Sequence, residues 1–98
     1  MAWVYILRCA DDSFYVGYTN DLEARVEWHN HGHGSNYTAP RLPVRVVYAE
    51  QHASMMSAIN RERQLKRWTA EKKAALIAGD RDLLKRLSKS RHRKHHPH

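Results

Sequence analysis

The sequence predicts an α+β domain with a small three-stranded antiparallel sheet flanked by helices. Two runs rich in β-branched and aromatic residues, 3–9 and 14–19, are separated by a short polar break, which is typical of a β-hairpin. A third run rich in valine, 44–50, lies between segments with helical signals. The resulting order, β-β-α-β-α-α, indicates helices packed on a small sheet.

The first helical segment follows the hairpin and is expected over residues 21–31. Asn20 can cap it, and Glu23 lies three residues further on, as in a capping box. Leu22 and Val26 would then face the core. The glycine- and serine-rich stretch that follows ends this helix and predicts a loop.

The later helices also begin at good capping residues. Ser54 can cap a helix that runs to about residue 68, and Thr69 can cap the next one, which Gly79 would end. Asp80 can cap a last short helix. The predicted organisation is a domain over 1–78, a short helix over 79–88 and a disordered basic, His-rich tail over 89–98.

The net charge of +7 is concentrated near the end of the chain. Residues 85–98 hold six lysines or arginines and no acid, whereas the preceding residues are nearly balanced. Such a tail is either a solvated end or a surface that binds phosphates without reading sequence. The candidate nucleic-acid contacts are Lys89, Arg91, Arg93 and Lys94.

The composition excludes several classes of protein. No apolar run is long enough to span a membrane, and no signal segment is visible, so we expect no membrane association. The single cysteine, Cys9, cannot form an internal disulfide, which makes a cytoplasmic location the default. No phosphate-binding glycine loop is present, and we expect no small-molecule cofactor. The sequence does not indicate an oligomeric state.

Tyr5 and Tyr15 are the first candidate site residues, one in each strand of the hairpin. Side chains alternate across a sheet, so the length of the hairpin loop decides whether they meet. A two-residue loop at Asp11 and Asp12 would place them on opposite faces, whereas an odd loop or a bulge would place them on one face. Gly17 follows Tyr15, and a glycine in a strand often marks close approach by a ligand or another backbone.

Arg25 and His29 lie four residues apart, on one side of the first helix. They flank the apolar positions of that helix, where an arginine can direct its planar guanidinium at a phosphate. The two histidines that follow, His31 and His33, form a His-x-His-x-His pattern with His29. One interpretation of this pattern is a metal site, but a flexible polar loop is favoured.

Glu62 falls in the middle of the apolar face of the helix that begins after Ser54. An unpaired charge in such a place is costly, so the carboxylate requires a partner or a metal. One interpretation is an ion pair with Lys66, four residues on in the favourable order. The other is a metal ligand. The apolar face is formed by Met55, Ala58, Ile59 and Leu65.

The hairpin resembles the GIY-YIG nuclease superfamily. Val4 and Tyr5 stand where that family has Ile-Tyr, and residues 15–17, Tyr-Val-Gly, stand where it has Tyr-Ile-Gly; Trp3 replaces the first glycine. The resemblance covers about residues 1–78 and is greatest to small stand-alone bacterial members, such as UPF0213-like proteins. It implies the GIY-YIG fold independently of the strand pattern.

The resemblance also implies a function, metal-dependent hydrolysis of DNA by an endonuclease. Glu62 would hold one Mg²⁺ or Mn²⁺, and Arg25 would neutralise charge in the transition state. One tyrosine, Tyr5 or Tyr15, would act as general base and the other would orient the water, while His29 supports the site. Gly17 and Lys66 are expected to contact the substrate. The alternative is a non-catalytic nucleic-acid-binding protein with the same fold.

Overall fold

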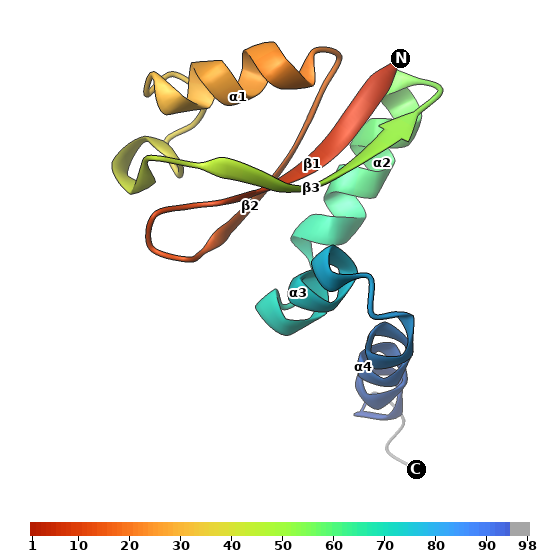
Figure 1. Ribbon diagram of the computed structural model, residues 1–98. Coiled ribbons are helices and arrows are strands. Elements are labelled where there is room, and N and C mark those ends of the chain that lie inside the picture. Colours follow the sequence, from red (N-terminus) through yellow and green to blue (C-terminus); the bar gives the residue numbers. More distant parts are fainter. Residues whose placement is uncertain (95–98) are drawn as a thin grey trace. The chain divides into compact units, whose positions relative to one another are not determined.

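The computed structural model describes residues 1–94, and its first 67 residues contain the three-stranded sheet (Figure 1). The strands are β1 (Ala2–Arg8), β2 (Phe14–Thr19) and β3 (Arg45–His52). They are antiparallel in the order β2-β1-β3, so β1 is the central strand. The predicted α+β class and the three-stranded antiparallel sheet are confirmed.

The β1–β2 hairpin has the geometry that a shared site requires. Its register pairs Tyr5 with Gly17 and Leu7 with Tyr15, which places the two tyrosines on the same face. Five residues, 9–13, connect the strands. Within this loop the amide of Cys9 donates to the carbonyl of Ser13, at 2.9 Å, and Asp12 has a positive φ of 67°. The odd loop length settles the alternative that the sequence left open.

Strand β3 pairs with the other side of β1 and is joined to a helix by a charged cluster. The register between β1 and β3 shifts at Ile6 and Leu7. Further along β3, the Glu50 carboxylate accepts hydrogen bonds from Tyr48 and from Arg61, the latter at 3.0 Å. Because Arg61 lies on α2 (Met55–Lys66), this contact fastens that helix to the sheet.

Helix α1 (Leu22–Asn30) begins one residue later than expected, because Asp21 and not Asn20 is its N-cap. The Asp21 carboxylate accepts from the amide of Ala24 at 3.1 Å, and Thr19 Oγ1 accepts from the amide of Asp21. Glu23 is therefore one position too early for a capping box. The predicted inward face is correct, since Leu22 and Val26 pack on a core cluster. That cluster comprises Tyr5, Leu7, Cys9 and Val44.

The segment between α1 and β3 folds back beneath the end of α1. The Asn30 side-chain amide makes two hydrogen bonds to the backbone of Val44, at 2.8 and 3.0 Å, which ties the two ends of the segment together. A short 3₁₀-helix, Ala39–Arg41, lies inside it, with Pro40 in its first turn.

The remaining helices begin where the capping residues predicted. Ser54 caps α2, Thr69 caps α3 (Ala70–Ala78), and Gly79 ends α3 in the left-handed region with a φ of 72°. The Asp80 carboxylate accepts from the amide of Leu83, at the start of α4 (Arg81–Lys94).

Helix α4 is longer than expected. The predicted helix ended at residue 88, whereas α4 continues to Lys94, so the expectation of disorder is corrected for residues 89–94. The physical reason is that no glycine or proline interrupts the chain before Pro97, and lysine and arginine are good helix formers. The rest of the predicted tail, residues 95–98, lies outside the described residues.

The contacts divide the chain into two compact units, and the first ends at Arg67. The second begins at Trp68 and contains α3, which packs with α4. This division differs from the predicted boundary at residue 78, because α3 finds its packing partner in the helix that follows it. None of the helices within residues 1–94 has the length and apolar character that crossing a bilayer requires.

Candidate functional site

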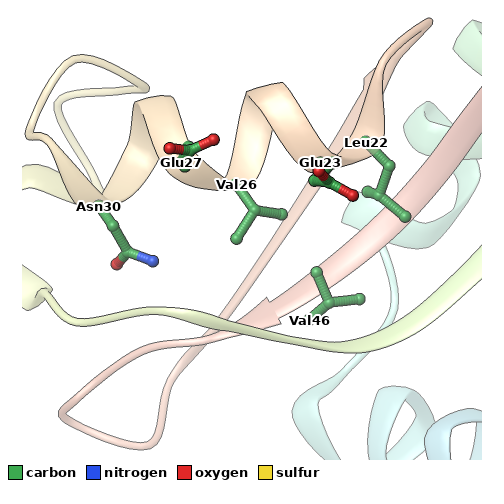
Figure 2. A pocket seen from close by; sticks show the side chains of 6 residues that line it. All are labelled: Leu22, Glu23, Val26, Glu27, Asn30 and Val46. Carbon is green, nitrogen blue, oxygen red and sulfur yellow. The ribbon is translucent and has the colours of Figure 1, made fainter.

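Two of the hollows in the first unit differ in chemistry. One, of about 550 Å³, lies between α1 and β3, where Val26 and Val46 point toward one another (Figure 2). Its lining is mainly aliphatic, and it contains none of the residues that the sequence nominated for chemistry. The other, of about 390 Å³, is lined mainly by polar groups from β1, β2, α1 and α2.

The polar cavity gathers the principal predicted site residues. Tyr5 from β1, Tyr15 from β2, Arg25 from α1 and Glu62 from α2 all line it, although they are up to 57 positions apart in the sequence. Their convergence follows from the hairpin register and from the two helices that contact the sheet. Its other lining residues are Gly17, Tyr18, Thr19, Asn20 and Met55.

Tyr5 is the most deeply buried of these residues, at 1% exposure. Its hydroxyl lies 3.0 Å from Nε2 of His29, which is fully buried. Burial raises the pKa of Tyr5 well above its usual range, and the nearby Tyr15 adds to that shift, whereas the positive charge of Arg25 opposes it. Tyr5 is therefore a neutral phenol at physiological pH.

Gly17 is present because the ring of Tyr5 occupies the space that a side chain would need. A Cβ atom at position 17 would lie 2.4 Å from the Tyr5 hydroxyl oxygen, closer than any real contact. The predicted close approach thus exists, but the approaching group is a side chain of the protein itself. Substrate contact by Gly17 stays a prediction.

Tyr15 sits at the mouth of the site among three other side chains. Its ring meets His29 edge to face, with centroids 5.2 Å apart, and stacks on Tyr37 at 6.1 Å. The Lys66 ammonium lies 5.5 Å from the centre of the same ring. These contacts fix the plane of Tyr15 and bring a positive charge to it.

Arg25 is half-buried on α1, and its guanidinium interacts in two directions. Its positive charge acts on Tyr5, where it opposes the rise in pKa, and it lies 5.2 Å from the ring centre of Trp28. A guanidinium held at the rim of a polar cavity can donate to phosphate oxygens. Arg25 is therefore well placed to bind an anion that enters the cavity.

Glu62 makes the ion pair that the sequence predicted as one of its two interpretations, whereas its role as a metal ligand stays a prediction. It is 8% exposed, and its Oε2 lies 3.0 Å from Nζ of Lys66, so the ion pair exists. The same carboxylate lines the polar cavity. Since the Lys66 side chain is about half exposed, it can leave the carboxylate and turn toward a negatively charged ligand.

The donor set of the cavity fits one magnesium ion and not a zinc ion. Glu62 is the single carboxylate among its lining residues, and Mg²⁺ is commonly held by one or two carboxylates with waters completing its shell. Within residues 1–94 no group of three or more His, Cys, Asp or Glu could hold a metal. The His-x-His-x-His segment is accordingly no metal cluster, because His29 is buried while His31 bonds to the carbonyl of Glu27.

Residues of the loop after α1 complete the site, and the sequence did not identify their role. Thr38 is fully buried, and its Oγ1 lies 2.9 Å from Nδ1 of His29. Ser35 contacts Thr38 in turn, at 3.0 Å. A Cβ atom at Gly34 would lie 1.9 Å from Nδ1 of His29, so the loop backbone packs directly on the imidazole. No sequence spacing signals these contacts, because a folded loop creates them.

We predict that the burial of His29 makes stability depend on pH. Burial, reinforced by Arg25, lowers the pKa of His29, so the unfolded chain binds a proton more readily than the folded protein. Its contribution is fully present above about pH 6.5 and is lost as the pH falls from there toward the folded pKa, by at most about 1.4 kcal/mol per pH unit. Urea unfolding between pH 8 and 5 measures this loss.

The control for this titration is His29→Gln, which carries no titratable group. Its stability at pH 8 will be lower, but the part of the pH dependence that comes from this residue will be absent. An identical pH dependence in both proteins would show that another histidine causes the effect.

The comparisons with known proteins identify the family of the chain. A family model described as the GIY-YIG catalytic domain matches residues 1–75. UPF0213 proteins from Staphylococcus aureus strains Mu3 and N315 are 47% identical over 75 residues, which cover 76% of this chain and 92% of each relative. The solution NMR structure of a UPF0213 protein from Bacillus halodurans is similar with a TM-score of 0.53 and 37% identity, over 82% of this chain and 86% of that one. The chain therefore belongs to the GIY-YIG nuclease family, with UPF0213 proteins among its relatives.

Proposed function

We propose that this protein is a metal-dependent endonuclease that hydrolyses phosphodiester bonds in DNA. The observation that carries the proposal is the meeting of Tyr5, Tyr15, Arg25 and Glu62 in one polar cavity. Family membership in a nuclease superfamily supports it independently. We place the protein in the cytoplasm, in keeping with the single free cysteine.

The charged residues of the cavity would bind the scissile phosphate. Arg25 can donate to the non-bridging oxygens and neutralise the negative charge that grows on them in the transition state. Lys66 can add a second positive charge once it leaves the Glu62 carboxylate. Glu62 would hold Mg²⁺ or Mn²⁺, which when bound stabilises charge on the phosphate and on the leaving oxygen.

Tyr5 is the better candidate for the general base, because it alone has a proton acceptor beside it. Its phenol proton can move to Nε2 of His29, 3.0 Å away, as the phenol oxygen takes a proton from the attacking water. The lowered pKa of His29 keeps the imidazole neutral but makes it a weaker base, so its protonation has to be concerted with attack of the water on phosphorus. Tyr15, held between His29 and Tyr37, would orient the water or the phosphate.

The test is nicking of a supercoiled plasmid by purified wild-type protein in Mg²⁺, in Mn²⁺ and in chelator. We expect cleavage with either metal and none in chelator. A panel of branched, single-stranded and RNA substrates, run under the same conditions, would identify the preferred substrate. Binding without cleavage of any member of the panel would instead support the non-catalytic nucleic-acid-binding alternative.

We predict that the basic end of α4 strengthens DNA binding in a salt-dependent way. Replacing Lys89, Arg91, Arg93 and Lys94 with glutamine removes four positive charges and retains good helix formers. Each lost phosphate contact should flatten the slope of log K against log salt by about 0.9, so the change reaches about 3.6 at most. Fluorescence anisotropy of a labelled duplex at several salt concentrations measures the slope.

A truncation after Ser88 is the companion variant, since it removes the same charges together with the helical segment. If the slope of log K against log salt flattens equally in both variants, the loss of the four charges is its cause. A slope that stays at the wild-type value in both would exclude this part of α4 from the DNA-binding surface.

A further inference from the structure

Behind Tyr5, the side chains of His29, Thr38 and Ser35 form a continuous chain of hydrogen bonds. The proposed nuclease function assigns no role to Thr38 or Ser35. His29 and Thr38 are both fully buried, and every contact between Tyr5 and Ser35 along this chain is 2.9 to 3.0 Å long. No buried side-chain polar atom in the described part of the chain is without a partner. Whether Nε2 of His29 can accept the proton of Tyr5 depends on which groups along this chain donate hydrogen.

We propose that Thr38 is a positioning residue, which holds His29 in the tautomer with hydrogen on Nδ1 so that Nε2 accepts from the Tyr5 hydroxyl. This inference rests on the proposed nuclease function, and it adds a residue from the loop after α1 to the site. Thr38 does not line the cavity and acts only through His29.

The inferred direction of donation runs from Thr38 to Ser35, which offers two acceptor oxygens. Its hydroxyl oxygen accepts from the amide of Thr38 at 3.0 Å, and its backbone carbonyl lies 3.4 Å from Thr38 Oγ1. Both oxygens are acceptors for the single hydroxyl hydrogen of Thr38. With that hydrogen directed at Ser35, the 2.9 Å contact to His29 requires a hydrogen on Nδ1. Nε2 then has none, and the 3.0 Å contact to Tyr5 is made by the phenol hydrogen.

This arrangement gives the catalytic proton a complete path. An O–H bond of the attacking water breaks and its proton goes to the Tyr5 oxygen, while the phenol proton moves to Nε2 of His29. The water oxygen forms the new bond to phosphorus as the bond between phosphorus and the leaving oxygen breaks, and that oxygen takes a proton from solvent water. The resulting imidazolium donates from both nitrogens, to Tyr5 and to Thr38, so its buried charge keeps two hydrogen bonds. With the opposite tautomer, Nε2 would carry a hydrogen and could not accept.

The loop around Thr38 holds the imidazole of His29 in place. Gly34 allows the backbone to lie against Nδ1 where any side chain would collide, and the Asn30 amide ties the far end of the loop to Val44. Rotation of the ring would therefore require the loop to open. This rigidity is typical of residues that orient a catalytic histidine from behind.

The experiment measures the His29 tautomer directly. In protein labelled with ¹⁵N-histidine at pH 8, nitrogen shifts assigned through His29→Gln report which ring nitrogen carries hydrogen. We expect Nδ1–H in the wild type and in Thr38→Ser, which keeps the hydroxyl. We expect a mixture of tautomers in Thr38→Val, which has nearly the same shape but no hydroxyl.

Steady-state cleavage supplies the second measurement. Thr38→Val should lower kcat by about tenfold or more and leave KM for DNA within about twofold, because Thr38 does not touch the substrate. Thr38→Ser should recover most of kcat. A merely structural threonine would not give this combination of tautomer change and hydroxyl-dependent kcat.

The outcomes separate this inference from the proposed function. Nε2–H in the wild type overturns the positioning role of Thr38, as does a Thr38→Val protein that keeps both its tautomer and its kcat. A wild-type protein that cleaves no nucleic acid but shows Nδ1–H, lost in Thr38→Val, overturns the nuclease proposal and retains the positioning role. Should Thr38→Val fail to fold, the wild-type tautomer and Ser35→Ala decide the question.

Discussion

We expect Glu62→Gln to lower Mg²⁺-dependent cleavage by at least about a hundredfold, which corresponds to about 2.7 kcal/mol of lost transition-state stabilisation. Glutamine keeps the size of the side chain and removes the charge that would hold the metal. DNA binding should remain, because Arg25 and the basic part of α4 are unchanged. Nicking assays and anisotropy on the same preparations measure the two properties.

The stability of the same variant in chelator separates a metal ligand from a structural ion pair. If Glu62 serves the metal, the metal-free protein contains a nearly buried carboxylate whose one ion-pair partner within the described residues is Lys66, and glutamine should leave stability level or raise it. If the pair with Lys66 is its role, stability should fall slightly and cleavage should persist.

Lys66→Gln is the matched control for the ion pair. It breaks the same 3.0 Å contact and leaves the carboxylate in the cavity. We expect a smaller loss of cleavage than in Glu62→Gln. A stability loss with intact cleavage in Glu62→Gln would remove Glu62 from the active site.

Tyr5→Phe is expected to have the second large effect, a fall in kcat of about a hundredfold or more. The variant keeps the ring that packs over Gly17 and removes only the hydroxyl between the cavity and His29. General base catalysis typically contributes between about a hundredfold and ten-thousandfold. Single-turnover cleavage in Mg²⁺ measures the chemical step without product release.

Tyr15→Phe is the matched comparison, since it deletes the equivalent oxygen from the other tyrosine. Its ring contacts with His29 and Tyr37 should persist, and we expect a smaller loss of kcat than for Tyr5→Phe. The reverse order would make Tyr15 the base. Full activity in both variants would mean that neither phenol oxygen takes part in proton transfer.

The local elements were predictable from the sequence because short-range physics specifies them. Ser54, Thr69 and Asp80 begin helices by accepting from backbone amides three residues further on, and Gly79 ends one through a conformation that other residues adopt poorly. The errors in the start of α1 and in the end of α4 also have local causes. Asp21, not Asn20, caps α1, and no residue stops α4 at position 88.

The sequence by itself determined the strands, the starts of α2, α3 and α4, and the family motif that names Tyr5, Tyr15, Arg25 and Glu62. Only the tertiary structure decided that they share a cavity, because a hairpin loop one residue shorter would have turned the tyrosines to opposite faces. The contact between Thr38 and His29 also became visible only in the tertiary structure, because an irregular loop brings together two side chains that are nine positions apart. The sequence specifies which chemical groups the side chains carry, whereas the hydrogen bonds between those groups form only when the chain folds.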